Sequence, residues 1–394
     1  DPRPNVVLTF LESTNAFFLT PYGDHYAGLM PQLSALAGQM TTIHGMHNTS
    51  APTISALITA LCSIHPPDHP ADLRRGASAD GRLAYTCVSD VLRTAGYRTV
   101  FLQGASKTVT GKEYFLRTHG FDQVLGLEDL QAAFPGARRG PWGMHDAQLV
   151  QFAQRTIDRL ERERAHDGRP FLLVMLTLDT HDPGMAAADC ALPPAVAQRF
   201  PAAVHRQLAA FHCSDRAIGT LGRFVLAPER RDRTLWLLTA DHAMFADLVD
   251  ARLYPTAGDR RHFAEIPLQL HDPLHQLPKR LDRLAGTRDL APTLLHLLGI
   301  QPALHSLTGR SLFGGTEAFP FLVGRSGERL VFARDATRAV ELPVGRLRTA
   351  CERGEVLLAG VVTALGVVDV TACDLQAWLG WQNGLWAAQR IFPA

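Results

Sequence analysis

The sequence has no excess of either charge: 39 Lys and Arg residues stand against 38 Asp and Glu residues, a formal net charge of +1. It therefore lacks the basic field that would hold nucleic acid or an anionic membrane face. It also lacks any run of roughly 18 consecutive apolar residues, which a membrane-spanning helix needs. We find no internal repeat, heptad or low-complexity tract. We expect a soluble chain, whose proximity to a membrane would come from an anchor upstream of Asp1.

Zinc-ligand spacing is absent too, although the chain has six cysteines. There is no C-x-x-C pair and no close cluster of Cys and His, so a structural zinc site is not indicated. The cysteines form three sequential pairs of similar separation: Cys62 and Cys87, Cys190 and Cys213, and Cys351 and Cys373. We predict these three disulfides, the simplest of many pairings, and with them an extracytoplasmic compartment such as the periplasm. Six buried free thiols of a cytosolic enzyme are the alternative.

Apolar runs without helical periodicity predict strands that are buried on both faces of a sheet. They occur at residues 5–11, 97–104, 170–178 and 234–240. Apolar side chains at i, i+3, i+4 and i+7 predict helices between them, at residues 30–39, 87–96, 146–165 and 206–225. The alternation predicts an α/β fold with a mainly parallel central sheet and helices on both faces.

The character of the sequence changes after a helix-like segment at residues 289–300. Later segments are Gly-rich, shorter and more β-like, as at residues 309–315, 329–335 and 355–370. We therefore predict a catalytic domain over residues 1–315 and a small C-terminal subdomain over residues 316–394.

Charged side chains follow two of the predicted strands, at the carboxyl ends where parallel sheets bind ligands. Glu12 ends the first strand, and Asp241 and His242 follow the strand at 234–240. A carboxylate there needs a partner, and carboxylate oxygen with neutral imidazole suits Zn, Mn or Mg-like ions. The alternatives are a Glu12 that caps the next segment and an Asp241 that caps a turn.

Polar side chains also follow the strand at 170–178. They are Asp179, His181 and Asp182. A histidine at this position is suited to act as a general acid or to contact an oxyanion.

Hydroxyl side chains crowd the start of an apolar helix within residues 47–63. They belong to Thr49, Ser50 and Thr53. Small hydroxyls at a helix start are usually caps. The alternative is a nucleophile, because the free N–H groups and the helix dipole favour a phosphate or sulfate anion at this end.

The order and spacing of these features resemble the alkaline phosphatase and sulfatase superfamily across almost the whole chain. Within it, the chain most resembles periplasmic phosphoglycerol transferases of osmoregulated glucans, and more distantly lipoteichoic acid synthase. The segments that carry the resemblance are PTISALITALCS at 52–63, residues 101–122, WGMHD at 142–146, and LTLDTHDPG at 176–184 with Cys190 following.

The resemblance implies one divalent metal ion (Mn, Mg or Zn) with the ligands Glu12, Ser50, Asp241 and His242. It implies Ser50 as the nucleophile, where relatives mostly carry Thr, with Thr49 and Thr53 as competitors. His181 would assist at the leaving or attacking oxygen. The expected substrate contacts are Lys112, which neutralises phosphate, and Gln103, His181 and Asp182. We also expect Asp241 to be a surface-facing ligand, so that its loss would spare the fold.

Three departures limit this resemblance. Formylglycine sulfatases need Cys or Ser followed by x-Pro-x-Arg, and Ile54 stands where that Arg would be. Lipoteichoic acid synthases have His-Gly and Trp-x-Arg where this chain has Gln103-Gly104 and Thr110-Gly111-Lys112. The glucan enzymes tend to have a second His in place of Asp182.

The sequence therefore predicts an enzyme that moves phosphoglycerol, or a related headgroup, through a covalent Ser or Thr intermediate. The expected partners are a phospholipid donor such as phosphatidylglycerol and a glycan acceptor, with no nucleic acid. The alternatives are a phosphoethanolamine transferase, a phosphodiesterase, a sulfatase, and a metal-free pseudoenzyme that senses lipid or glucan.

Overall fold

The computed structural model describes residues 3–66, 85–261, 263–302 and 307–314. Beyond residue 314 it describes three short strands and the positions Thr349, Cys351 and Cys373. Among the described residues no helix is both long and apolar enough to cross a membrane.

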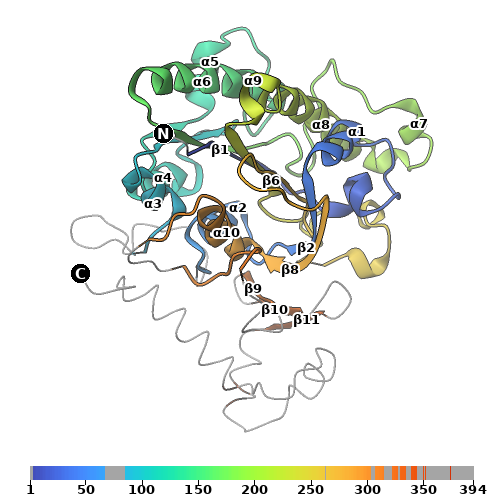
Figure 1. Ribbon diagram of the computed structural model, residues 1–394. Coiled ribbons are helices and arrows are strands. Elements are labelled where there is room, and N and C mark those ends of the chain that lie inside the picture. Colours follow the sequence, from blue (N-terminus) through green and yellow to red (C-terminus); the bar gives the residue numbers. More distant parts are fainter. Residues whose placement is uncertain are drawn as a thin grey trace. The chain divides into compact units, whose positions relative to one another are not determined.

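A mixed sheet of eight strands forms the framework (Figure 1). Its strands are β1 (Asn5–Leu11), β2 (Thr41–His47), β3 (Arg98–Gln103), β4 (Gln123–Leu125), β5 (Phe171–Leu176), β6 (Thr234–Ala240), β7 (Leu268–His271) and β8 (Arg280–Gly286). The order across the sheet is β4-β3-β5-β1-β6-β7-β2-β8. β1 pairs in parallel with β5 and β6, and β3 pairs in parallel with β5 and β4. β7 runs antiparallel to β6 and β2. The predicted mainly parallel sheet is confirmed.

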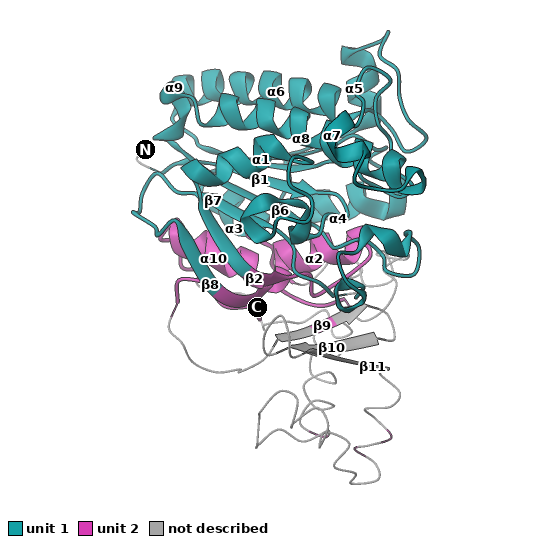
Figure 2. Cartoon of the chain, turned by 90° about the vertical axis from the view of Figure 1, so that its right-hand side faces the viewer, with its two compact units in different colours: residues 1–44, 89–282 teal, residues 45–88, 283–394 magenta. Residues whose placement is uncertain are grey.

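The central strands are the apolar runs of the sequence. Every residue of β1, β5 and β6 is buried, as expected for parallel strands that are covered on both faces. The helices are α1 (Pro31–Leu36), α2 (Thr53–Cys62), α3 (Val88–Thr94), α4 (Lys112–Thr118), α5 (Leu127–Ala133), α6 (Asp146–Asp167), α7 (Pro194–Ala197), α8 (His205–Val225), α9 (Pro228–Arg231) and α10 (Leu290–Leu297). α6 and α8 pack against each other, and Figure 2 shows them side by side over the sheet.

The chain divides into two compact units (Figure 2). The first unit comprises residues 1–44 and 89–282, and the second comprises residues 45–88 and 283–394. In the C-terminal region, β9 (Leu322–Ser326), β10 (Arg329–Ala333) and β11 (Ala339–Pro343) form an antiparallel sheet. The β-like segment predicted at 329–335 thus contains a strand, whereas residues 309–314 contain none. Residues 355–370 and the predicted boundary at 315/316 lie outside the described residues, and the boundary stays a prediction.

Three disulfides tie segments of the chain together. They join Cys62 to Cys87, Cys190 to Cys213 and Cys351 to Cys373. The predicted sequential pairing is confirmed, and each closed loop is worth roughly 3 kcal/mol in the chain-entropy view.

A buried carboxylate joins α8 to α1. Asp215 accepts hydrogen bonds from the backbone N–H groups of Gln32 (3.0 Å) and Leu33 (2.8 Å). These groups belong to the first turn of α1, whose N–H groups have no partner inside the helix. Burial raises the pKa of Asp215 to about 7, although the two hydrogen bonds oppose the shift.

We expect the fold to lose stability as pH rises from about 4 to about 7, because the unfolded pKa of an Asp is about 3.9. In this window the unfolded chain ionises at Asp215 before the folded chain does, so stability falls by up to about 1.4 kcal/mol per pH unit and then levels off. Guanidinium unfolding between pH 4 and 8 should show a shallower dependence for Asp215→Asn than for the wild type. Asp232→Asn removes a carboxyl that is 90% exposed and should leave the slope unchanged. An equal slope in all three proteins would contradict the assignment.

Candidate metal and phosphate site

Three predicted metal ligands lie together at the carboxyl ends of the neighbouring parallel strands β1 and β6. Glu12, Asp241 and His242 each present one ligand atom within 4.8 Å of the others. His242 Nε2 is 3.3 Å from Asp241 Oδ2 and 3.7 Å from Glu12 Oε1. All three side chains are buried. This cluster lies wholly within the first unit.

Hydroxyl side chains hold Glu12 in place. Its backbone N–H donates to Thr177 Oγ1 at 2.8 Å, and its carbonyl accepts hydrogen bonds from the hydroxyls of Thr180 and Thr14. Ser13 Oγ donates to Glu12 Oε1 at 2.7 Å. Ser13 has a φ of 49°, which is uncommon for a residue with a side chain and often marks a functional site. The backbone of Glu12 is therefore held from the end of β5, and its carboxylate is held by the neighbouring Ser13.

Hydrogen bonds also fix the other two side chains. His242 Nδ1 donates to the carbonyl of Ala243 at 2.8 Å, so Nε2 faces the carboxylates. Asp241 Oδ1 accepts the backbone N–H groups of Ser13 (3.0 Å) and His242 (2.8 Å). Asp241 is fully buried, which corrects the expectation of a surface-facing ligand. Its loss would leave two buried N–H groups without an acceptor.

This donor set fits a divalent cation. Burial, with the charge of Glu12, raises the pKa of Asp241 to about 7. Burial lowers the pKa of His242, but the charges of Asp241 and Glu12 outweigh it and raise the pKa. Asp241 Oδ2 is buried and accepts no hydrogen bond from any described residue. Since a buried carboxylate oxygen without a hydrogen bond is costly, and carboxylate with imidazole suits Zn, Mn or Mg, this group is suited to hold a cation.

Lys112 is a buried cation in the same unit. It begins α4 directly after Thr110 and Gly111, both of which have positive φ and turn the chain. Its side chain is 6% exposed. Burial lowers the pKa of its ammonium group, while the charges of Glu12 and Asp241 act in the opposite direction. The structure thus brings Lys112 within electrostatic reach of the carboxylates.

The three candidate nucleophiles belong to the second unit and differ in their contacts there. Thr49 Oγ1 lies 2.8 Å from Thr287 Oγ1, which also accepts the backbone N–H of Thr49. Thr53 is the first residue of α2. Ser50 is buried, and its hydroxyl makes no hydrogen bond to the described residues. Of the three, the hydroxyl of Thr49 is engaged in structure, and that of Ser50 is available.

His181 and Asp182 lie on the loop after β5. The rings of His181 and Trp142 are 4.3 Å apart between centroids, and Trp142 Nε1 donates to the carbonyl of Asp182 at 3.2 Å. His181 Nδ1 donates to the same carbonyl at 3.0 Å, which leaves Nε2 as the acceptor of a neutral ring. Such a ring is able to exchange a proton with a substrate oxygen.

Gln103 ends β3 but is turned toward its own loop. Its Nε2 donates to the carbonyl of Ser106 at 2.8 Å. Its Oε1 is buried and has no hydrogen-bond donor among the described residues. The structure thus gives Gln103 a loop-holding contact, and its predicted role in substrate binding stays a prediction.

Sequence reasoning missed the link between WGMHD and the loop after β5. Asp179 Oδ1 accepts from His145 Nδ1 at 2.8 Å, and Asp179 Oδ2 accepts the backbone N–H of Asp146 at 3.1 Å. Asp146 Oδ1 in turn accepts the backbone N–H of Leu178 at 2.7 Å. The hydrogen bond that His145 donates to Asp179 raises the pKa of His145, and burial raises the pKa of Asp146 to about 8. The only hint of this link in the sequence is that both segments contain Asp and His.

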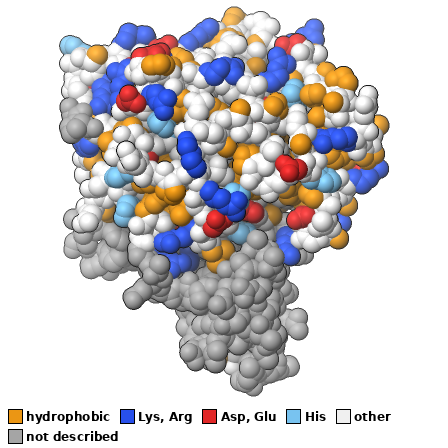
Figure 3. Space-filling view, turned by 45° about the vertical axis from the view of Figure 1, so that its right-hand side comes forward, with side chains coloured by type: hydrophobic (Ala, Val, Ile, Leu, Met, Phe, Trp, Pro, Cys, Tyr) orange, Lys and Arg blue, Asp and Glu red, His pale blue; other side chains and the backbone are white. Residues whose placement is uncertain are grey.

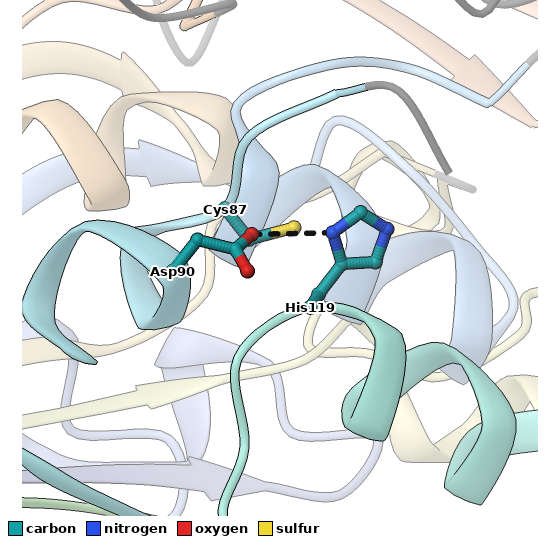
Figure 4. Close-up of side chains that lie close together, drawn as sticks. All are labelled: Cys87, Asp90 and His119. Carbon is teal, nitrogen blue, oxygen red and sulfur yellow. Dashed lines mark hydrogen bonds and ion pairs between the residues drawn. The ribbon is translucent and has the colours of Figure 1, made fainter. Parts of the chain in front are cut away.

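A further acid and imidazole pair occurs elsewhere in the first unit (Figure 4). His119 Nδ1 lies 3.2 Å from Asp90 Oδ2. Cys87, labelled in the same figure, forms a disulfide with Cys62 and has no thiolate to offer a metal. We assign no metal site to these residues.

Comparison with known proteins gives a family match and curated relatives. The profile of the Sulfatase family matches residues 4–300. Phosphoglycerol transferase I of Xanthomonas campestris pv. campestris (strain B100) is 31% identical over 324 residues, which cover 79% of this chain and 43% of that protein. Phosphoglycerol transferase I of Shigella flexneri is 26% identical over 351 residues, which cover 87% of this chain and 43% of that protein. The chain thus spans less than half the length of these curated relatives.

Solved structures show the same fold. The lipoteichoic acid synthase LtaP of Listeria monocytogenes superposes with a TM-score of 0.72 at 14% identity, covering 97% of this chain and 92% of that one. A protein in the alkaline phosphatase superfamily from Vibrio parahaemolyticus gives a TM-score of 0.69 at 22% identity, covering 86% and 77%. At these identities the likeness establishes the fold alone.

Proposed function

The chain belongs to the Sulfatase family, and from that premise we propose that it is a metal-dependent phospho-group transferase. In this proposal it moves phosphoglycerol, or a related headgroup, from a phospholipid donor such as phosphatidylglycerol to a glycan acceptor. The curated phosphoglycerol transferases at about 30% identity support the choice of reaction. The fold shared with a lipoteichoic acid synthase is consistent with it.

One observation carries the proposal. A buried group of two carboxylates and one imidazole ends two neighbouring parallel strands, and one carboxylate oxygen in it accepts no hydrogen bond from the described residues. We propose that Glu12, Asp241 and His242, with Ser50 as the fourth ligand, hold one divalent ion. Such an ion, when bound, lowers the pKa of a hydroxyl and neutralises phosphate charge.

In the proposed mechanism, Ser50, His181 and Lys112 each have a separate role. Ser50 Oγ attacks the phosphorus of the donor, the bond from phosphorus to the lipid oxygen breaks, and phosphoglycerol is left covalently on Ser50. His181 Nε2 takes up the proton that the Ser50 hydroxyl loses and gives it to the leaving lipid oxygen. In the second half it takes the proton of the attacking sugar hydroxyl and returns it to Ser50 Oγ. Lys112 binds an equatorial phosphate oxygen, and its burial strengthens that attraction. Transfer to the sugar then frees Ser50.

The unmodified hydroxyl separates this proposal from sulfate-ester hydrolysis. Formylglycine sulfatases require an Arg four residues after the modified position, and the chain has Ile54 there. The three disulfides favour an oxidising compartment, so we propose that the reaction occurs outside the cytoplasm, in the periplasm.

A panel of donors tests the proposal. We expect release of diacylglycerol from phosphatidylglycerol in the presence of Mn²⁺, with a phosphoglycerol adduct on the peptide that contains Ser50. Removal of metal with EDTA should stop the release, and Mn²⁺ should restore it. Preference for phosphatidylethanolamine would make the chain a phosphoethanolamine transferase. Cleavage of an aryl sulfate with formylglycine at position 50 in the intact mass would refute phospho-group transfer.

A further inference from the structure

The first unit contains a pocket of about 660 Å³ beside the loop that carries His181. Three arginines line it: Arg138, Arg139 and Arg206. Arg138 and Arg139 are exposed and form no ion pair with any described residue. Asp189 is the only acidic residue in the lining, so the pocket carries an excess of positive charge.

Close contacts fix the walls of this pocket. A Cβ on Gly140 would lie 2.4 Å from Met185 Sδ, so the loop that carries Arg139 packs tightly against the loop after β5. At the other wall, Arg206 Nε donates to the carbonyl of Gly184 at 3.1 Å. The arginines therefore come from separate elements, the loop before α6 and the first turn of α8, and converge on one cavity that is already formed.

One more side chain of interest lines the pocket, and another directly follows a lining residue in the sequence. His145 also lines the pocket, and its hydrogen bond to Asp179 raises its pKa, which favours an imidazolium. Trp142 follows Pro141 of the lining and is 47% exposed as a residue, and its indole Nε1 donates to the carbonyl of Asp182. An exposed indole with a fixed edge offers a flat face that is suited to stacking on a sugar ring.

We propose that this pocket binds an anionic ester group, phosphate or sulfate, carried by the sugar acceptor, and that Trp142 contacts the sugar ring. This inference rests on the proposed function and deepens it, because it makes the acceptor an anionic glycan. Guanidinium groups bind phosphate and sulfate with paired, charge-assisted hydrogen bonds. The arginines converge on a concavity, whereas docking on a lipid surface would call for a flat or convex basic face. On the face in Figure 3, Lys and Arg side chains are spread among neutral groups and form no continuous basic field.

Titration calorimetry of the metal-free protein with glucose 6-phosphate tests the pocket without using catalysis. The double variant Arg138→Gln/Arg139→Gln should bind at least about tenfold more weakly than the wild type, since it loses charge-assisted contacts. The double variant Arg162→Gln/Arg231→Gln removes the same charge from exposed positions outside the pocket and should bind as the wild type does. Trp142→Ala should weaken binding of glucose 6-phosphate but not of inorganic phosphate.

Several outcomes would overturn the inference. These are unchanged binding in the Arg138/Arg139 variant, equal losses in both double variants, and an Arg138/Arg139 variant that loses only its binding to phosphatidylglycerol vesicles. The last result would make the arginines a membrane contact. Release of diacylglycerol by the metal-loaded protein is measured separately. Its absence in the wild type would refute the proposed transferase, whereas a wild type that releases diacylglycerol but does not bind glucose 6-phosphate would refute the pocket alone.

Discussion

Asp241→Asn is expected to lower metal-dependent turnover by at least about a thousandfold, which corresponds to about 4 kcal/mol of transition-state stabilisation. The substitution removes the charge from a carboxylate whose Oδ2 accepts no hydrogen bond from the described residues and faces His242 Nε2 at 3.3 Å. It also keeps an oxygen that is able to accept the N–H groups of Ser13 and His242. Asp241→Ala should lose turnover as well, with an added stability loss of about 1–3 kcal/mol because those N–H groups are left unpaired.

Thermal unfolding with and without Mn²⁺ provides the second readout. A ligand that binds only the folded state stabilises it, so Mn²⁺ should raise the Tm of the wild type and leave that of Asp241→Asn unchanged. Without metal, Asp241→Asn should be at least as stable as the wild type, since it relieves the repulsion between Glu12 and Asp241 that raises the pKa of Asp241. The exposed substitution Asp232→Asn should keep both turnover and the Mn²⁺ response. A full Mn²⁺ response in Asp241→Asn would remove this residue from the metal site.

The sequence predicts the fully buried central strands and the long amphipathic helices of the fold. β1, β5 and β6 are fully buried and appear as continuous apolar runs, while α6 and α8 each extend over about six turns with clear periodicity. β3 also lies in a predicted apolar run, at 97–104, whereas β2, β4, β7 and β8 lack this signal. β4 has three residues, and β8 (RLDRLAG) contains three charged residues among its first four. The antiparallel course of β7 depends on its pairing with β6 and β2, which no local pattern specifies.

The sequence allows side chains to be placed near one another where they directly follow parallel strands. Glu12 and the Asp241–His242 pair each end an apolar run, so their meeting follows from the parallel pairing of β1 and β6. The contacts that hold these side chains in place cannot be inferred from strand ends. The contact of Thr177 with the backbone of Glu12 joins positions 165 residues apart, and that of His145 with Asp179 joins positions 34 apart. Such contacts require the register of the sheet, which the sequence alone does not give.

Ser50→Ala is expected to abolish formation of the covalent phospho-enzyme, whereas Ser50→Thr should retain a measurable part of the activity. Thr keeps the hydroxyl, but its added methyl group has to fit at a position that is only 1% exposed. Thr49→Ala should keep the adduct, because the hydroxyl of Thr49 is already paired with Thr287 Oγ1 at 2.8 Å. Thr49→Ala should instead lower the free energy of unfolding by about 1 kcal/mol, because a hydrogen bond is lost.

Thr53→Ala is the matched control at the start of α2. Thr53 is the first residue of that helix, so we expect its loss to affect the helix start and to leave the adduct on Ser50. Mass spectrometry of the peptide that spans residues 47–63, after incubation with phosphatidylglycerol, separates the three hydroxyls. An adduct that persists in Ser50→Ala and disappears in Thr49→Ala or Thr53→Ala would move the nucleophile to that residue. The assignment of Glu12, Asp241 and His242 as metal ligands would stand, because it rests on their own geometry and on an Asp241 Oδ2 that accepts no hydrogen bond from the described residues.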